Sequence, residues 1–388
     1  MTATRRLLAA CLLLPLLAGC AILREFSPAV VMEPMSPGEY IALQRGDILT
    51  SGRLSALTAQ SIRVSGLDVD GCASSTGACV DAMDRAAGVA DERRLSALAE
   101  LWLQQAMALD RAGSEADARL RAWMEVARHA YAYLFFTGRT PGERVFEDRQ
   151  TQVRDWYNYA VQEAIALLFE ESRRIRDDGA PQAEVFERAG WTFRIDLAGI
   201  RMPEGVHMPQ ELLPAASLSF QGLRSTWRRD GFGAELVAVT VDDPVTAVSD
   251  DAEDADGSAR SRRRPGPAWS EMPATAITAL LRFPGENLAQ VLSTHEVELS
   301  AHDPYRDARI ELQGQEVPLA ANFTAGYGLW LARSGFNRQS LRSLLGREQG
   351  IDRPHLYLMQ PYDPDRRIIL MIHGLASSPE AWVNVANE

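Results

Sequence analysis

Three long stretches with apolar residues at helical spacing constrain the fold of this chain most strongly. In each stretch apolar side chains recur every three or four positions, which gathers them on one face of an α-helix. The stretches run from Asp91 to Gly113, from Leu120 to Gly138 and from Thr151 to Gly179. Only short breaks separate them, so the pattern predicts three amphipathic helices in an antiparallel helical domain.

The third stretch contains the aromatic group Trp156-Tyr157-Asn158-Tyr159. A ligand site is one interpretation, but aromatic residues at helical spacing usually belong to a core, and we favour the core. Two short helices are predicted before the long ones. The first starts at Ser36-Pro37-Gly38-Glu39, which has the form of a capping box. The second covers Ser55 to Ser65, with Leu57, Ile62 and Val64 expected to face inward.

Past Gly190 the apolar pattern changes from helical spacing to the alternation of strands with one buried face. Four segments have this character: Trp191–Leu197, Leu236–Val241, Ile277–Phe283 and Val291–Leu299. A charged segment at 249–267 interrupts them, with an acidic block followed by Arg260 and Arg262–Arg264. We expect a solvated loop there. The alternative is contact of Arg262–Arg264 with anionic lipid headgroups.

The first twenty residues have the form of an export signal. Arg5-Arg6 precede a short apolar region, and Leu17-Ala18-Gly19-Cys20 follows it. These four residues resemble the lipobox of bacterial lipoproteins, which implies cleavage before Cys20 and attachment of lipid to it. The alternatives are an ordinary signal peptide or a short membrane anchor. By the same resemblance, Ala21 after the cysteine implies the periplasmic face of the outer membrane. Residues 21–35 are expected to form a tether.

Two further cysteines, Cys72 and Cys79, flank a small Gly/Ser-rich segment that we expect to be a loop. In an exported protein such a pair predicts a disulfide. A metal site would need more Cys or His nearby, and none is present in the adjoining sequence.

Composition and motifs exclude several functional classes. The net charge of -12 argues against a nucleic-acid partner, because phosphate neutralisation needs a basic surface. No phosphate-binding glycine loop or dinucleotide fingerprint occurs, so we predict no cofactor. His295, His302 and Asp303 are the weak alternative for a metal site. Their spacing matches no known ligand set, so we predict no metal and assign the histidines to surface or core.

The C-terminal part begins with helical sequence at Val317–Leu331, with another short helix expected at Ser340–Leu345. Two predicted strands follow, His355–Gln360 and Ile368–Ile372, joined by a turn at Pro361–Asp365. The second is a continuous apolar run, which favours a strand buried on both faces of a parallel sheet. It leads into His373-Gly374, and Ser378-Pro379 then opens a helix as N-cap and first helical residue.

Three segments in this order resemble the large proteobacterial α/β-hydrolase lipoproteins of lipase or esterase type: Pro318–Ala325, Tyr357–Pro364 and His373–Trp382. The resemblance implies that His373 and Gly374 shape an oxyanion loop in which the backbone N–H of Leu375 is a donor. It also implies a nucleophilic serine in a later Gly-x-Ser-x-Gly turn, followed by the acid and the histidine. None of these is found here, so the chain contains no predicted catalytic residue. Ser377 and Ser378 are not predicted to be the nucleophile, because neither lies in a strand-to-helix turn between two glycines. Ser378 is better explained as a helix cap.

These observations predict an α+β chain with an N-terminal helical domain at 36–189, a β-rich region at 190–316 and the start of an α/β-hydrolase sheet at 317–388. We expect the chain to be the N-terminal portion of a membrane-anchored serine hydrolase that acts on an ester or lipid. Without the residues beyond Glu388, this portion is expected to be inactive. The alternative is a non-catalytic envelope lipoprotein that works as a binding or scaffold module.

Overall fold

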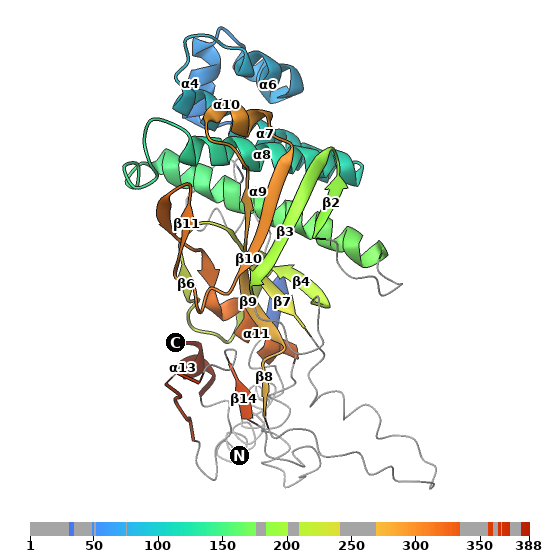
Figure 1. The fold of residues 1–388 in the computed structure, drawn as a ribbon, viewed down its shortest axis with the longest axis vertical. Coiled ribbons are helices and arrows are strands. Elements are labelled where there is room, and N and C mark those ends of the chain that lie inside the picture. The colour runs from blue at the N-terminus through green and yellow to red at the C-terminus, as the bar shows by residue number, and fades with distance from the viewer. Residues whose placement is uncertain are drawn as a thin grey trace, which may run out of the picture.

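The computed structural model describes residues 31–34, 49, 52–74, 76–175, 184–200, 209–240, 269–333, 356–359, 364–365, 367–372 and 382–388. Helices and strands are mixed within this part of the chain (Figure 1). Outside it lie the predicted helices that start at Ser36 and Ser340 and the charged segment at 249–267.

The three long helices predicted from apolar spacing are confirmed. They are α7 (Asp91–Arg111), α8 (Ala116–Phe135) and α9 (Asp148–Ile175). Helix α4 (Ala56–Val64) is also confirmed, and the Ser55 hydroxyl caps it by accepting a hydrogen bond from the Thr58 N–H. Its expected inner face was wrong in part, because Ile62 is buried whereas Leu57 and Val64 are exposed.

The expected loop around Cys72 and Cys79 is wrong, although the predicted disulfide is present. The two cysteines lie in helices α5 (Val69–Ser74) and α6 (Thr76–Asp84), joined by a disulfide with their Cα atoms 5.2 Å apart. Helix α5 can start here because the Asp68 carboxylate accepts a hydrogen bond from the Gly71 N–H. Both cysteines are buried in a small apolar cluster against α7, at the top of the molecule in Figure 1.

A six-stranded mixed sheet forms the centre of the fold, in the order β2-β3-β10-β9-β7-β4. Its strands are β2 (Val185–Arg188), β3 (Trp191–Gly199), β4 (Glu211–Pro214), β7 (Ala234–Val239), β9 (Ala274–Arg282) and β10 (Glu296–His302). Strands β3 and β10 pair in parallel, and the other neighbours pair antiparallel.

The predicted strand at Val291–Leu299 is half wrong. Residues Leu288–Ser293 form helix α10, and strand β10 begins only at Glu296. The Asn287 side chain caps the helix by accepting a hydrogen bond from the Gln290 N–H at 3.0 Å. Leu288, Val291 and Leu292 are also spaced as one side of a helix requires, so local capping decided the structure here.

Short elements surround this sheet. Pairs of strands are β1 (Val31–Pro34) with β5 (Leu218–Gln221), β6 (Arg228–Arg229) with β13 (Ala321–Asn322), β11 (Arg309–Leu312) with β12 (Gln315–Pro318), and β8 (Trp269–Glu271) with β14 (Leu356–Leu358). A 3-10 helix, η2 (Ala215–Ser217), and two α-helices, α11 (Phe323–Arg333) and α13 (Val383–Asn387), complete the set of regular elements used below. The end of the predicted tether is thus paired with the body through β1.

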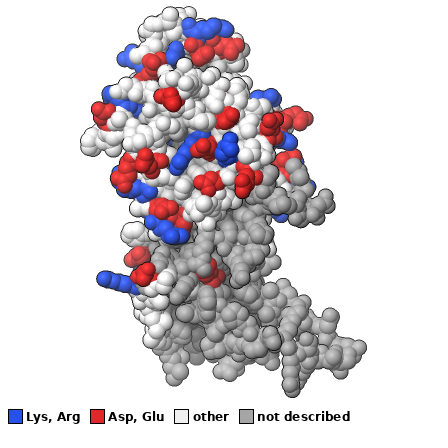
Figure 2. All heavy atoms as spheres, viewed as in Figure 1, with Lys and Arg blue, Asp and Glu red and all other residues white. Residues whose placement is uncertain are grey.

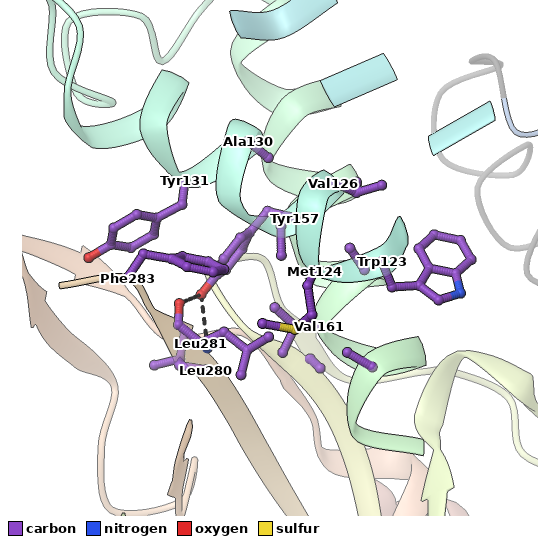
Figure 3. Packing of buried hydrophobic residues seen from close by; sticks show 14 of the residues in the cluster. Trp123, Met124, Val126, Ala130, Tyr131, Tyr157, Val161, Leu280, Leu281 and Phe283 are labelled. Atoms are coloured by element: carbon purple, nitrogen blue, oxygen red, sulfur yellow. Dashed lines mark hydrogen bonds between the residues drawn. The ribbon is translucent and has the colours of Figure 1, made fainter. Parts of the chain in front are cut away.

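Helices α8 and α9 cover one face of the sheet, and they cross behind strands β3 and β10 in Figure 1. One continuous apolar cluster joins residues of these helices, such as Trp123 and Tyr157, to sheet residues such as Leu280 and Phe283 (Figure 3). Part of the opposite face carries charge, with Glu298 of β10 directly between Arg194 of β3 and Arg282 of β9. Figure 2 shows acidic and basic side chains intermixed over this side of the molecule.

Two buried arginines tie the ends of the long helices together. The fully buried Arg144 donates to the carbonyls of Tyr133 and Leu134 at the end of α8, at 3.0 and 3.1 Å, and pairs with Glu92 of α7. Arg149 of α9 pairs with the buried Glu100 of α7 at 3.2 Å. Because each guanidinium is balanced by a carboxylate or by carbonyls, the helix ends have one favourable arrangement.

The phenol of Tyr157 connects α9 to the part of β9 that extends beyond its pairing with β7. Strand β7 begins at Ala234, opposite Ala279 of β9, so Leu281 lies beyond the last residue pair. The Tyr157 hydroxyl donates to the Leu281 carbonyl at 2.7 Å and accepts from the Leu281 N–H at 3.2 Å (Figure 3). One hydroxyl therefore satisfies both backbone groups in a place that water does not reach.

The apolar run Ile368–Ile372 was expected to be a buried strand, and the structure contradicts this. Residues 367–372 belong to no strand, and the side chains of Ile368, Ile369, Leu370 and Ile372 are 69–85% exposed. A strand needs a neighbour to accept its backbone hydrogen bonds, and no described strand lies beside this run. The preceding strand, predicted at His355–Gln360, is present as β14.

We predict that Tyr157→Phe lowers the free energy of unfolding by about 2 kcal/mol, because it leaves the N–H and C=O of Leu281 buried without a partner. Urea unfolding measures the change. Tyr159→Phe is the matched control on the same helix, since no residue that the structure describes hydrogen-bonds its hydroxyl, and we expect a change within about 0.5 kcal/mol. Equal effects of the two substitutions would contradict this role of Tyr157.

Candidate functional site

The residues predicted from sequence to form the site fall in two classes. Cys20 and the oxyanion-loop candidates His373, Gly374 and Leu375 lie outside the described residues, as do Ser377 and Ser378. Cys72 and Cys79 are described and form the disulfide. The structure therefore describes only the residues on either side of the segment that contains His373, Gly374 and Leu375.

The strand before this segment is attached to the body by a parallel strand pair. Leu356 of β14 lies opposite Trp269 of β8, and Leu358 lies opposite Glu271. The N–H of Met272 also donates to the Leu358 carbonyl at 3.0 Å. The C-terminal part thus pairs with a strand of the β-rich region that lies about 90 residues earlier in the chain.

The helix after this segment is attached to α11. The Tyr327 hydroxyl donates to the Val383 carbonyl at 3.1 Å, and the Thr324 hydroxyl donates to Asn387 Oδ1 at 2.8 Å. Asn387 in turn donates from Nδ2 to the Ser225 carbonyl at 2.9 Å. Val383 is buried in an apolar cluster with α11 residues such as Leu329 and Trp330. In Figure 1, α11, α13, β8 and β14 lie together in the lower part of the molecule.

Helix α11 is itself held tightly, because two glycines let it approach its neighbours closely. A Cβ on Gly326 would lie 2.9 Å from the Ala274 carbonyl oxygen of β9. A Cβ on Gly328 would lie 2.6 Å from the ring of Phe220 in β5. Residues Thr324–Leu331 are all buried, so this helix lies between the sheet and the C-terminal elements.

A second candidate site is a small polar cleft of about 70 Å³ between α9 and the turn that joins β6 to β7. The Asn158 side chain shapes its floor, because it donates to the Gly231 carbonyl at 2.8 Å and accepts from the Gly233 N–H at 2.7 Å. Its lining residues come from α9, from η2, from the β6–β7 turn and from the segment before β13: Arg154, Asp155, Asn158, Tyr159, Gln162, Ala216, Arg228, Asp230, Gly231, Gly233, Ala234, Glu235 and Ala320.

Charged side chains dominate the chemistry of this cleft. Arg228 forms a two-pronged pair with Glu235, with Nη2 2.7 Å from each carboxylate oxygen, and Arg154 pairs with Asp155 at 3.1 Å. Burial raises the pKa of the Glu235 carboxyl, while the Arg228 guanidinium opposes the shift. The cleft therefore suits a small polar or charged molecule better than an acyl chain. Sequence reasoning missed it, because its walls come from segments that no local pattern connects.

The weak metal alternative, His295, His302 and Asp303, does not form a cluster. The exposed His295 packs against the ring of Trp191, and His302 Nε2 lies 2.9 Å from the Ser300 hydroxyl. Burial lowers the pKa of His302, which disfavours its protonated form. Within the described ranges, no three or more His, Cys, Asp or Glu residues are grouped as a metal site requires.

No helix in the part of the chain that the structure describes combines the length and apolar character of a membrane span.

Reduction of the Cys72–Cys79 disulfide should lower the free energy of unfolding of residues 21–388 by about 2–3 kcal/mol, the value that loop-closure entropy gives for so short a loop. Thermal or urea unfolding with and without a reductant measures this. A variant with both Cys72→Ala and Cys79→Ala should not respond to the reductant. Two free thiols in the untreated protein would contradict the bridge.

No family model, curated protein or solved structure matches this chain. A functional assignment therefore has to rest on the residues and contacts given above.

Proposed function

We propose that the chain is the N-terminal, lipid-anchored portion of a serine hydrolase of the α/β-hydrolase class that cleaves acyl esters. One observation carries the proposal: the apolar run Ile368–Ile372 exposes its side chains directly before His373-Gly374. An exposed run of β-branched residues is an aggregation hazard unless other strands cover it. In an α/β-hydrolase, strands on both sides would do so.

In this proposal the chemistry follows the usual course of acyl transfer. A serine beyond Glu388 attacks the ester carbonyl, a histidine takes its proton, and an acid orients the histidine. The C–O bond to the alcohol then breaks, the histidine returns the proton to the leaving alcohol, and water releases the acid from the acyl-enzyme by the same route. The tetrahedral intermediate carries a negative oxygen, which the backbone N–H of Leu375 stabilises together with a donor near the serine. His373 and Gly374 shape the loop that presents this N–H. The residues up to Glu388 thus supply part of the oxyanion hole but no nucleophile.

The proposal also gives the N-terminal segment its role. Lipid on Cys20 would anchor the protein in the envelope, at the periplasmic face of the outer membrane, since each buried methylene contributes roughly 0.8 kcal/mol. Strand β1 begins eleven residues after Cys20, and an extended chain of that length spans at most about 40 Å. The body would therefore stay close to the membrane, where an ester or lipid substrate is available.

The polar cleft beside Asn158 favours a second candidate, a non-catalytic envelope lipoprotein that binds a small polar ligand. Its paired charges, and the hydrogen bond by which Asn158 fixes the Gly231 backbone, are features of polar binding sites. The two candidates differ in the covalent step, because only the hydrolase forms an acyl-enzyme or reacts with a serine-directed probe.

The full gene product, produced from the codons of this chain and those that follow in frame, should react with a fluorophosphonate probe and hydrolyse p-nitrophenyl butyrate. Residues 21–388 alone should do neither, because no nucleophile is present. Labelling is read by mass spectrometry and turnover by absorbance. A stop codon directly after Glu388, or ester turnover by residues 21–388, would contradict the proposal.

Cys20→Ala should move the protein from the membrane fraction to the soluble periplasmic fraction, because the lipid chains are lost. Fractionation followed by immunoblotting measures the distribution. Cys11→Ala is the matched control, since this cysteine lies within the signal and should leave membrane association unchanged. Membrane retention of the Cys20→Ala variant would favour an uncleaved membrane anchor instead.

A further inference from the structure

The charges that line the polar cleft beside Asn158 do not balance. Two arginines and three acids line it: Arg154, Arg228, Asp155, Asp230 and Glu235. Two positive and three negative charges leave a net charge of -1. Arg154 lies 3.1 Å from Asp155, and Arg228 holds both carboxylate oxygens of Glu235. Both arginines are therefore engaged by a carboxylate, whereas no ion pair or hydrogen bond joins the Asp230 side chain to a residue that the structure describes.

This arrangement disfavours an anion in the cleft and favours a cation. An anion would have to compete for each guanidinium with the carboxylate that already holds it. Burial raises the pKa of the Glu235 carboxyl, the Arg228 guanidinium opposes the shift, and the carboxylates of Asp230 and Asp155 add to it. The three acids therefore lie within electrostatic range of one another and contribute to one negative potential.

Gln162 of α9 supplies a buried acceptor in the wall of this cleft. The residue is only 5% exposed, and its amide nitrogen donates to Glu163 Oε1 at 3.0 Å. An ionised carboxylate only accepts, so this bond directs the nitrogen toward Glu163 and leaves Oε1 on the other side of the amide group. No residue that the structure describes donates to this oxygen. A buried amide oxygen without a donor costs free energy, and a ligand in the cleft can supply the donor.

Tyr159 supplies a second acceptor in the same wall. It lies three residues before Gln162 on α9, so the two side chains are neighbours on the helix surface. Its ring packs edge-on against Trp123 with the ring centroids 5.3 Å apart, which restricts the direction of the phenol. Among the described residues its hydroxyl has no hydrogen-bond partner. Two polar groups without partners therefore lie side by side in the wall of a negatively charged cleft.

The turn that faces this wall has a fixed shape. Asn158 bonds with the Gly231 carbonyl at 2.8 Å and with the Gly233 N–H at 2.7 Å. A Cβ on Gly231 would lie 2.5 Å from the Ala320 nitrogen, so the turn also packs closely against the segment before β13. The cleft measures about 70 Å³, and a single water needs roughly 10–15 Å³ of such space. It therefore has room for a ligand of a few non-hydrogen atoms between walls that are already in place.

We infer that this cleft binds a small primary ammonium compound such as ethanolamine. Its ammonium group donates to the Gln162 amide oxygen and the Tyr159 hydroxyl, while the Asp230 carboxylate supplies the opposite charge. A metal ion is a poorer match, since within the described ranges no three His, Cys, Asp or Glu residues are grouped as a metal site requires. The inference goes beyond the proposed hydrolase function and does not rest on it, and it names the ligand that the second candidate leaves open.

The first test compares four probes of similar size by isothermal titration calorimetry on the full gene product in detergent. Ethanolamine is the expected ligand. Ethylene glycol has a similar shape and no charge, glycolate carries a negative charge, and tetramethylammonium carries a positive charge without an N–H donor. We expect ethanolamine to bind at least about tenfold more tightly than each of the others, because only ethanolamine combines the positive charge with donors.

Substitutions then locate the binding. Asp230→Asn should weaken ethanolamine binding about tenfold, because it removes the opposite charge and keeps the shape of an exposed side chain. Tyr159→Phe should weaken it about threefold through the lost acceptor, without a loss of stability. Glu286→Gln is the matched control. It removes one exposed carboxylate from the turn before α10, outside the lining of the cleft, and should change the affinity less than about twofold.

Three results would overturn the inference: no binding of ethanolamine, tighter binding of glycolate than of ethanolamine, or equal effects of Glu286→Gln and Asp230→Asn. In the last case the affinity would follow the overall charge of the protein. None of these results depends on ester hydrolysis. A gene product that binds ethanolamine and hydrolyses no ester keeps the inference and contradicts the proposed hydrolase, and the reverse result overturns the inference alone.

Discussion

The contact of helix α9 with one face of the six-stranded sheet is the interaction on which the other features depend. Helix α9 also packs with α8, which itself reaches the sheet where Arg128 lies over the ring of Trp191 in β3. Two adjacent residues make its specific bonds: Tyr157 completes the backbone bonding of Leu281, and Asn158 fixes the Gly231–Gly233 turn. Tyr157 thus bonds with β9 beyond the end of β7, and Asn158 lines the polar cleft.

Two buried arginines restrict how the long helices can pack. An apolar stripe alone permits a helix to slide or rotate on a sheet, since hydrophobic contact has no direction. Arg144 and Arg149 remove that freedom within the helical layer, because Arg144 must reach acceptors on α7 and α8 and Arg149 must reach Glu100 of α7. Displacing either helix by one turn would leave a guanidinium buried without a partner, which costs several kcal/mol. Apolar spacing thus places the helices, and the buried arginines set their register.

Apolar patterns within a single stretch of sequence predicted the helices and strands that bury one face of that stretch. Apolar spacing located α7, α8 and α9, and alternation located β3, β7 and β9. Prediction failed where a short cap outweighed the wider pattern, as Asn287 does at α10 and Asp68 does at α5. The strand order and the polar cleft could not be predicted, because each depends on residues more than 60 positions apart. The disulfide could be predicted from the sequence, because two cysteines close together in an exported protein pair whether the backbone between them is a loop or a helix.

The run Ile368–Ile372 shows that a strand depends on its neighbours as much as on its own residues. Its composition is that of a buried strand, yet its side chains lie in solvent where no described strand accompanies them. The segments on both sides of it, β14 and α13, are nevertheless seated on the body through hydrogen bonds and buried apolar contacts. The side chains of the run therefore become buried only if further strands pair beside it, which is the arrangement that the proposed function requires.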